Sequence, residues 1–162
     1  MEQSKLISES VYEIKAGFGF EPFVLGRTRE EVRSCAGEPS AIESMPELEH
    51  EEIWRYPNWG VSLVFSDEYS WRLTSVDCES AGHTINGYLF IGLEQDALIK
   101  CARLAGIDDL VLDGDYEEFG KCYTSHDYSL MFWLVDNVVI NFSVMLAFDA
   151  DGDCPLWPQR PA

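Results

Sequence analysis

Two segments of the chain share one pattern, and this internal similarity is the strongest constraint on the fold. Residues 23–39 contain a short apolar run that ends at Gly26, then a helix-like stretch and a closing glycine. Residues 89–107 repeat that order around Gly92, which lies 66 residues downstream of Gly26. One helix over a few strands is too small to bury a core alone, so we expect the two halves to combine.

Each of these segments is followed by sequence typical of an antiparallel hairpin. In the first half, residues 54–65 alternate apolar and polar side chains, and residues 71–76 supply a partner strand. In the second half, residues 128–135 and 138–144 flank Asp136-Asn137, which predicts a tight turn. The shared order of elements indicates one continuous sheet built from both halves.

The sequence therefore predicts an α+β fold in which two similar helix-plus-antiparallel-hairpin repeats share one sheet, with the helices on one face. We place the repeats at about residues 11–78 and 85–146 of a single domain, 1–162, with a polar C-terminal tail. The helices are expected at about residues 28–36 and 93–105.

The first helix carries recognisable start and stop signals. Thr28 and Glu31 form a capping box, in which each side chain accepts a hydrogen bond from the other residue's backbone N–H. Gly37 suits the left-handed position after a helix, and Pro39 prevents its continuation. These signals fix the predicted helix between residues 28 and 36.

The motif at residues 25–32, with the Gly-Glu-Pro of 37–39 and the Trp-Arg-Tyr of 54–56, resembles a recurring small bacterial domain. It is similar to the SmpA/OmlA lipoprotein domain and to the tandem β-lactamase-inhibitor-protein-like (BLIP-like) fold, over roughly residues 20–145. The export signal and lipidated cysteine of the lipoproteins are missing here, so membrane assembly is not implied. The chain resembles more closely the small acidic cytoplasmic immunity proteins encoded beside interbacterial toxins.

The charge of the chain narrows its possible partners. Eleven Lys and Arg against 29 Asp and Glu give a net charge of −18 and a pI near 4.3. General nucleic-acid binding is excluded, because phosphate recognition needs a basic surface. Disorder is also disfavoured, since 46% of the residues are hydrophobic and 13% are aromatic.

Two acidic segments lie at matching places, between the helix and the hairpin of each half. The first contains Glu43, Glu47, Glu49, Glu51 and Glu52, and the second contains Asp108, Asp109, Asp113, Asp115, Glu117 and Glu118. We expect both on one side of the sheet, where they attract a basic protein, or alternatively form a solvated face that serves solubility only. The candidate partner-binding residues are Asp108, Asp109, Asp113, Asp115, Tyr116, Glu117, Glu118, Glu49, Glu51 and Glu52.

Other chemistry has weaker support. Cys122 and His126 form no complete catalytic motif. The alternating acidic residues at 113–117 and 149–153 match no complete calcium motif. His83 is expected in a surface linker. Five cysteines without a C-x-x-C pair indicate reduced, mostly buried thiols. We therefore expect no enzymatic activity, cofactor or metal.

The predicted function is a cytoplasmic immunity protein that neutralises a basic, nuclease-type toxin domain, with no nucleic-acid or membrane partner. Cytoplasmic location is expected because the start of the sequence has no signal-peptide pattern and no apolar run reaches membrane-spanning length. The alternative function is a small structural or regulatory domain whose acidity serves solubility.

Overall fold

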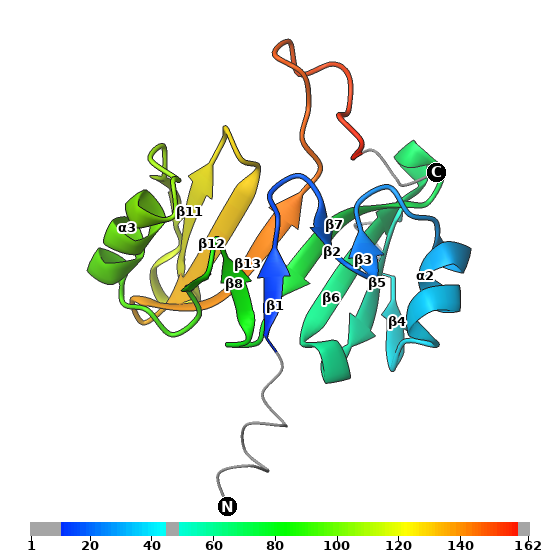
Figure 1. Cartoon of the computed structure of the whole chain (residues 1–162), viewed down its shortest axis with the longest axis horizontal. Helices are drawn as coiled ribbons and strands as arrows, with labels where there is room; N and C mark the ends of the chain where they lie inside the picture. The colour runs from blue at the N-terminus through cyan, green and yellow to red at the C-terminus, as the bar shows by residue number, and fades with distance from the viewer. Residues whose placement is uncertain (1–10, 45–48, 159–162) are drawn as a thin grey trace, which may run out of the picture.

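A computed structural model describes residues 11–44 and 49–158 of the chain. An eight-stranded antiparallel sheet forms its centre, in the order β10-β11-β12-β13-β7-β6-β5-β4 (Figure 1). The strands of this sheet are β4 (Ala41–Glu43), β5 (Glu51–Tyr56), β6 (Val61–Ser66), β7 (Arg72–Cys78), β10 (Val111–Asp115), β11 (Lys121–Ser125), β12 (Leu130–Val135) and β13 (Val138–Met145). The fold is α+β, and the sheet is continuous across both halves of the chain, as predicted.

Each half contributes one helix followed by four consecutive strands of this sheet. The two sets of strands meet at β7 and β13, where Val76 lies opposite Val144 and Cys78 lies opposite Phe142. Both central strands come last in their half, so the edges of the sheet, β4 and β10, are the strands that directly follow the helices.

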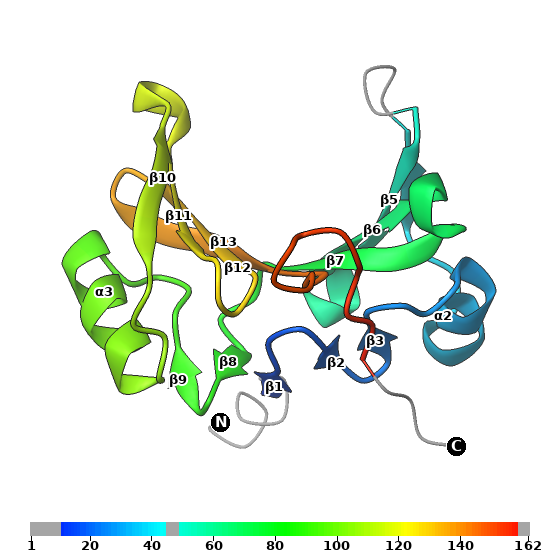
Figure 2. The same ribbon diagram turned by 90° about the horizontal axis from the view of Figure 1, so that it is seen from above.

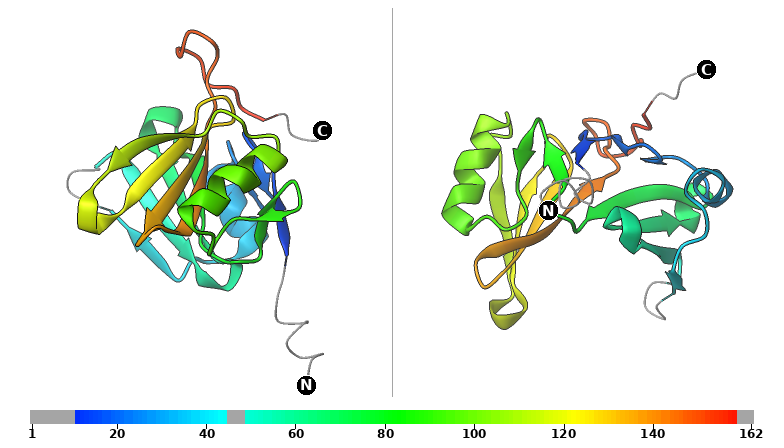
Figure 3. Two further views of the ribbon diagram at one scale, coloured as in Figure 1. Left: turned by 90° about the vertical axis from the view of Figure 1, so that its left-hand side faces the viewer. Right: turned by 60° about the horizontal axis from the view of Figure 1, so that its bottom comes forward.

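The two helices, α2 (Arg29–Ala36) and α3 (Gln95–Leu104), lie on the same face of the sheet (Figure 2). Their positions agree with the predicted ranges. The capping box is present: Thr28 Oγ1 accepts from the backbone N–H of Glu31, and the Glu31 carboxylate accepts from the backbone N–H of Thr28. The sheet is bent, so the face without helices is concave (Figures 2 and 3).

The core lies between the sheet and the helices. Alternate strand positions supply it, and one cross-strand row runs through Trp54, Leu63, Val76 and Val144. Each of these side chains is at most 1% exposed. Burial of such a side chain contributes about 1.5–3 kcal/mol, which makes this row a main stabilising element of the fold.

Five short strands complete the helix side of the sheet (Figure 2). They are β1 (Tyr12–Ile14), β2 (Gly19–Phe20), β3 (Phe23–Val24), β8 (His83–Ile85) and β9 (Tyr88–Leu89). The first strand pairs in parallel with β8, so the N-terminal strand joins the second half of the chain. Glu13 reinforces this pairing by accepting from Thr84 Oγ1 at 2.7 Å and from the backbone N–H of Gly87 at 3.0 Å.

The turn between β12 and β13 also agrees with the sequence. Asp136 and Asn137 both have positive φ angles, 54° and 64°. Two-residue hairpins of this kind match the twist of the flanking strands, and Asn and Asp tolerate the left-handed region better than most residues.

The prediction that His83 lies in a surface loop is wrong. Its side chain is fully buried, and its ring contacts Tyr12 and Phe20. Nε2 lies 3.1 Å from the carbonyl oxygen of Trp59, and Nδ1 lies 3.3 Å from the backbone nitrogen of Ser80. Nδ1 also lies 3.1 Å from the carbonyl oxygen of Ser80, so the role of Nδ1 depends on the tautomer, while burial lowers the pKa of His83 and favours the neutral ring.

The thiols are less buried than the sequence indicates. All five cysteines are free, but Cys35 and Cys154 are exposed, whereas Cys78 and Cys122 are buried. Cys35 lies near the end of the short helix α2, on which Val32 is the buried residue, so the apolar face does not extend to it.

The described part of the C-terminal segment packs against the first half. Tyr69 has ring contacts with both Phe148 and Trp157, and the guanidinium of Arg72 lies 5.5 Å from the Trp157 ring centroid. The aromatic residues in this segment therefore anchor it to the turn between β6 and β7. The sequence predicts only a polar tail here and does not predict this packing.

Candidate protein-binding surface

The concave face of the sheet carries a polar row across its centre. Register pairs Arg55 with Ser62, Ser62 with Asp77, and Asp77 with Ser143. Their neighbours along the strands, such as Trp54 and Val76, point into the core, so this row points to the opposite face. The row spans both halves of the chain.

Arg55 organises the first-half end of this row. Its Nε and Nη2 donate to the two carboxylate oxygens of Glu43 at 2.9 and 3.2 Å, and its Nη1 donates to Ser62 Oγ at 2.8 Å. The hydrogen bond and charge of Arg55 lower the pKa of Glu43. Ser62 in turn donates to Glu79. Glu43 is thus committed to an ion pair within the chain.

Asp77 lies where the two halves meet. Ser143 Oγ donates to its carboxylate at 2.6 Å, and Ser75 Oγ donates to it at 3.3 Å. Burial raises the pKa of Asp77 despite these hydrogen bonds and the nearby charge of Arg55. The Asp77 side chain is therefore held in one position in the middle of the concave face.

The second half adds a projecting segment, which we call the acidic arm (residues 111–120). It comprises β10 and the short 3-10 helix η4 (Glu117–Phe119), and it rises at one end of the concave face (Figure 2). The Tyr116 ring stacks on Trp133 of β12, with the ring centroids 5.7 Å apart. Gly114 permits this contact, because a Cβ there would lie 2.7 Å from the Tyr116 ring.

The acidic arm displays the predicted combination of acids and aromatics. Asp113, Asp115, Glu117 and Glu118 are exposed. Tyr116 is 55% exposed and Phe119 is 72% exposed. Exposed aromatics among charges are typical of the residues that dominate binding energy at protein interfaces.

Other predicted site residues have different roles. Asp109 accepts from Ser125 Oγ at 2.6 Å and from the backbone N–H of Asp127 at 2.9 Å. Burial alone would raise the pKa of Asp109, but these hydrogen bonds lower it below its usual value. Asp109 therefore fixes the turn between β11 and β12, while Asp108 is exposed beside it.

The first acidic segment is divided between the two faces of the sheet. Glu52 lies on the helix side, where it pairs with Arg29 at 3.2 Å and accepts from Trp54 Nε1 at 3.0 Å. Glu51 is half-buried, and its register position places it on the concave side. Glu49 is exposed beside His50, and Glu47 lies outside the described residues.

The two acidic segments do not form one patch. They belong to opposite edges of the sheet, β10 at one end and β4 and β5 at the other. Figure 2 shows both edges rising on the same, concave side. The expectation that both segments lie on one side of the sheet is therefore met only in part, because Glu52 faces the helix side and the segments belong to opposite edges of the sheet.

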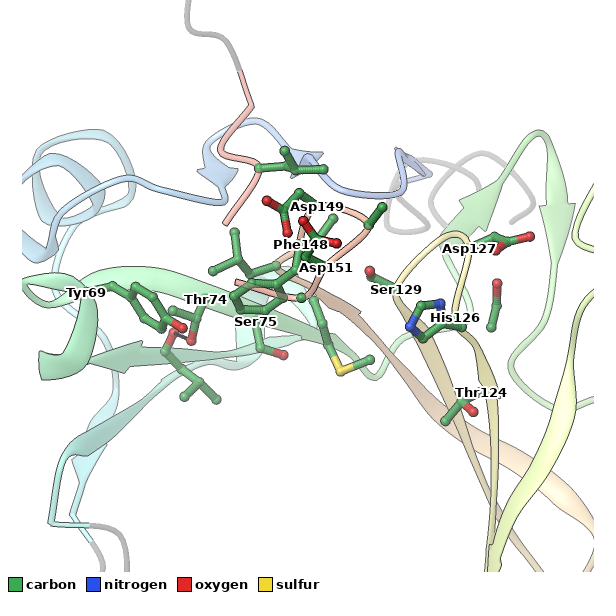
Figure 4. Close-up of a pocket in the computed structure, with 18 of the residues that line it drawn as sticks. Tyr69, Thr74, Ser75, Thr124, His126, Asp127, Ser129, Phe148, Asp149 and Asp151 are labelled. Atoms are coloured by element: carbon green, nitrogen blue, oxygen red, sulfur yellow. Dashed lines mark hydrogen bonds between the residues drawn. The ribbon is translucent and has the colours of Figure 1, made fainter. Parts of the chain in front are cut away.

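Glu51 and Asp113, one from each segment, share the lining of a cavity at one end of the strands, which we call the end cavity. It has a volume of about 970 Å³, and its walls come from the β6–β7 turn, the β11–β12 turn and the C-terminal loop. Figure 4 shows Tyr69, Thr74 and Ser75 on one side and His126 and Ser129 on the other.

Among the described residues, the possible catalytic and metal-binding groups have other surroundings. Cys122 is buried on β11, and burial raises its pKa, which disfavours a reactive thiolate. Within residues 11–44 and 49–158, no three His, Cys, Asp or Glu side chains are grouped as metal ligands. Asp149 instead accepts from the backbone N–H groups of Asp153 and Cys154, which shapes the C-terminal loop.

Sequence reasoning missed Arg55, Asp77 and Trp133 as surface residues. The available signal was the alternation within each strand, because a polar residue between two core positions points to the opposite face. Asp77 stands between Val76 and Cys78, for example, and both of these are buried. Alternation alone does not show that this opposite face is concave and open.

Fold and surface together define an α+β protein with a bent antiparallel sheet, its helices on one face and an acidic, partly aromatic surface on the other. No family model matches the chain, and a search of curated proteins gives no match. Within the described residues, no helix has the length and apolar character needed to cross a bilayer.

Two solved structures share a distant likeness with this chain. One is an extracellular protein containing an SCP domain from Bacillus anthracis, with 11% identity, a TM-score of 0.44, and coverage of 75% of this chain and 43% of that chain. The other is a DUF4309 family protein, YjgB, from Bacillus subtilis, with 13% identity, a TM-score of 0.46, and coverage of 80% and 87%. The chain thus spans less than half of the SCP-domain protein.

Proposed function

We propose that this chain is a cytoplasmic protein-binding module, an immunity protein that neutralises a basic, nuclease-type toxin through its concave face. The observation that carries the proposal is the acidic arm, in which the exposed rings of Tyr116 and Phe119 stand among four exposed carboxylates. The stacking of Tyr116 on Trp133 orders this arm before binding, which lowers the entropy cost of association.

The charge of the whole chain supports a basic partner. A net charge of −18 creates a field that accelerates encounter with a positively charged protein and is screened by salt. Asp77 and Glu51 place further carboxyl groups on the concave face, away from the acidic arm.

The two-repeat organisation is part of the same proposal. We place the repeats at about residues 11–78 and 85–146, in line with the resemblance to SmpA/OmlA-like and BLIP-like tandem domains. The identical order of helix and four strands in each half supports this. Two similar units joined edge to edge would produce the wide concave face that binds the partner.

The test is co-expression with a basic toxin domain encoded next to this gene, followed by association-rate measurements on the purified pair. We expect protection of the cells, and an association rate that falls steeply as salt rises past 0.1 M, where the Debye length is about 10 Å. A rate that does not respond to salt would contradict electrostatic recognition and favour a role of the acidity in solubility alone.

A charge-matched pair of variants locates the surface. Glu117→Lys/Glu118→Lys reverses two exposed charges on the acidic arm, and Glu30→Lys/Asp96→Lys reverses two exposed charges on the helix side. We expect the arm variant alone to weaken the complex strongly. Exposed charges contribute little to folding, so both variants should remain folded. Equal effects of the two variants would place the interface elsewhere.

A further inference from the structure

We infer that the end cavity is a binding site for an alkyl-guanidinium or alkyl-ammonium group, supplied by an arginine or lysine side chain of the basic partner. The identity of the partner rests on the proposed function. The chemistry of the cavity rests on its own lining and is tested without the partner.

The charges of the lining favour a cation. Five carboxylates line the end cavity, those of Glu51, Asp113, Asp127, Asp149 and Asp151. The lining residues that the structure describes include no lysine or arginine, and His126 is the one that can become positively charged. A negative cavity of this kind is complementary to a basic side chain.

The carboxylates on two walls are available to a ligand. Among the described residues, none forms a hydrogen bond or ion pair with the side chain of Asp113 or Asp151. Asp113 belongs to the edge strand β10, and Asp151 belongs to the C-terminal loop, where Figure 4 shows it next to Asp149. Both residues line the end cavity, so each offers a carboxylate to a guanidinium group that enters it.

The rest of the lining suits an aliphatic stem better than a hydrated metal ion. Val64, Met145 and Leu146 supply apolar surface, and Thr74 and Ser75 supply hydroxyl groups beside it. Arginine and lysine bury their methylene groups against apolar surface while their charged ends reach polar groups. The volume of about 970 Å³ leaves room for the backbone that carries such a side chain.

The position of the cavity connects it to the proposed interface. Glu51 and Asp113 belong both to the acidic segments and to the cavity lining. A partner lying on the concave face can therefore extend one basic side chain into the cavity. Such an anchor in a pocket is the arrangement in which single residues contribute most to binding.

The experiment titrates the full chain with a tri-arginine peptide and, as the neutral isosteric control, a tri-citrulline peptide, followed by NMR. We expect saturable shifts at the backbone amides of cavity residues such as Thr124 and Ser129 with tri-arginine only. Equal shifts with tri-citrulline would overturn the inference. Calcium chloride that reproduces the same shifts would overturn it as well, because it would assign the cavity to a metal ion.

A second pair of variants separates the cavity from the overall charge. Asp113→Asn/Asp151→Asn removes two lining carboxylates, whereas Asp136→Asn/Asp153→Asn removes two exposed carboxylates outside the lining. We expect the first variant to weaken tri-arginine binding by roughly three- to tenfold and the second by less than about twofold, given the usual strength of exposed ion pairs. Equal weakening of tri-arginine binding by the two variants would show that the cavity acts only through the overall negative charge, and would overturn the inference.

The result of the tri-arginine titration is independent of the result of the toxin test. Loss of the cavity signal with an intact, salt-sensitive toxin complex refutes the inference and leaves the proposed function standing. Tri-arginine binding at the cavity without any toxin complex leaves the chemistry of the site standing and refutes the proposed partner.

Discussion

Replacing Tyr116 with alanine is expected to loosen the acidic arm while leaving the sheet folded. The ring stacks on Trp133 at a centroid distance of 5.7 Å and is 55% exposed, so the substitution removes a surface contact and leaves the core unchanged. Aromatic pairs contribute about 0.5–1.5 kcal/mol beyond the area they bury. That range corresponds to a roughly two- to twelvefold increase in the population of the open arm.

Amide hydrogen exchange measures this opening directly. The backbone N–H of Tyr116 donates to the carbonyl of Gly120 at 2.8 Å, and the N–H of Phe119 donates to the carbonyl of Tyr116 at 3.1 Å. We expect faster exchange at these two amides in Tyr116→Ala, and little change in the central strands. Phenylalanine at position 116 keeps the ring and serves as the control.

Gly114→Ala tests the same contact without altering either ring. The new Cβ would lie 2.7 Å from the Tyr116 ring, so the ring must shift from its position against Trp133. We expect exchange in the arm to accelerate as in Tyr116→Ala, and the two changes together to have no more effect than one. Independent, additive effects would show that the stack does not order the arm.

Three further outcomes follow from local contacts. Thr28→Ala should lower the free energy of unfolding by about 1 kcal/mol in urea titrations, because it removes the helix cap, and Thr28→Ser should restore most of it. The pKa of His83 is lowered by burial, so the folded state binds fewer protons than the unfolded state below the unfolded pKa of about 6.5. Stability contributed by His83 should therefore be complete above that pH and fall as the pH drops below it. An NMR titration of the His83 ring that gives a pKa above about 6.5 would contradict the buried neutral ring. Alkylation without reductant should modify Cys35 and Cys154 quickly and the buried thiols only on unfolding, whereas an unreactive pair would indicate a disulfide.

Local signals allowed much of the fold to be predicted. The capping box at Thr28 and the turn at Asp136-Asn137 act within a few residues, so they are legible in one sequence. The alternation of apolar and polar residues within the strands likewise predicted the two hairpins. The parallel pairing of β1 with β8 escaped prediction because its partners are about 70 residues apart, and strands of three residues carry little pattern.

The candidate site was predicted only in part, for a related reason. The acidity and aromatic content of residues 113–119 are properties of one segment, and the structure exposes them together. Whether Glu52 faces the concave side or the helix side depends on strand register, which charge alone does not determine. His83 shows the same limit, because its burial results from contacts with Tyr12 and Trp59, which are distant in sequence.

The pairing of β1 with β8 makes the two halves of this chain complementary fragments. A cut in the short connection between Cys78 and His83 would leave β1 on one fragment and its pairing partner on the other. The interface between β7 and β13 would be divided in the same way. Each fragment would then expose the edges that the other covers, so we expect the two to reassemble when expressed together. The same exchange between two intact chains would give a domain-swapped dimer.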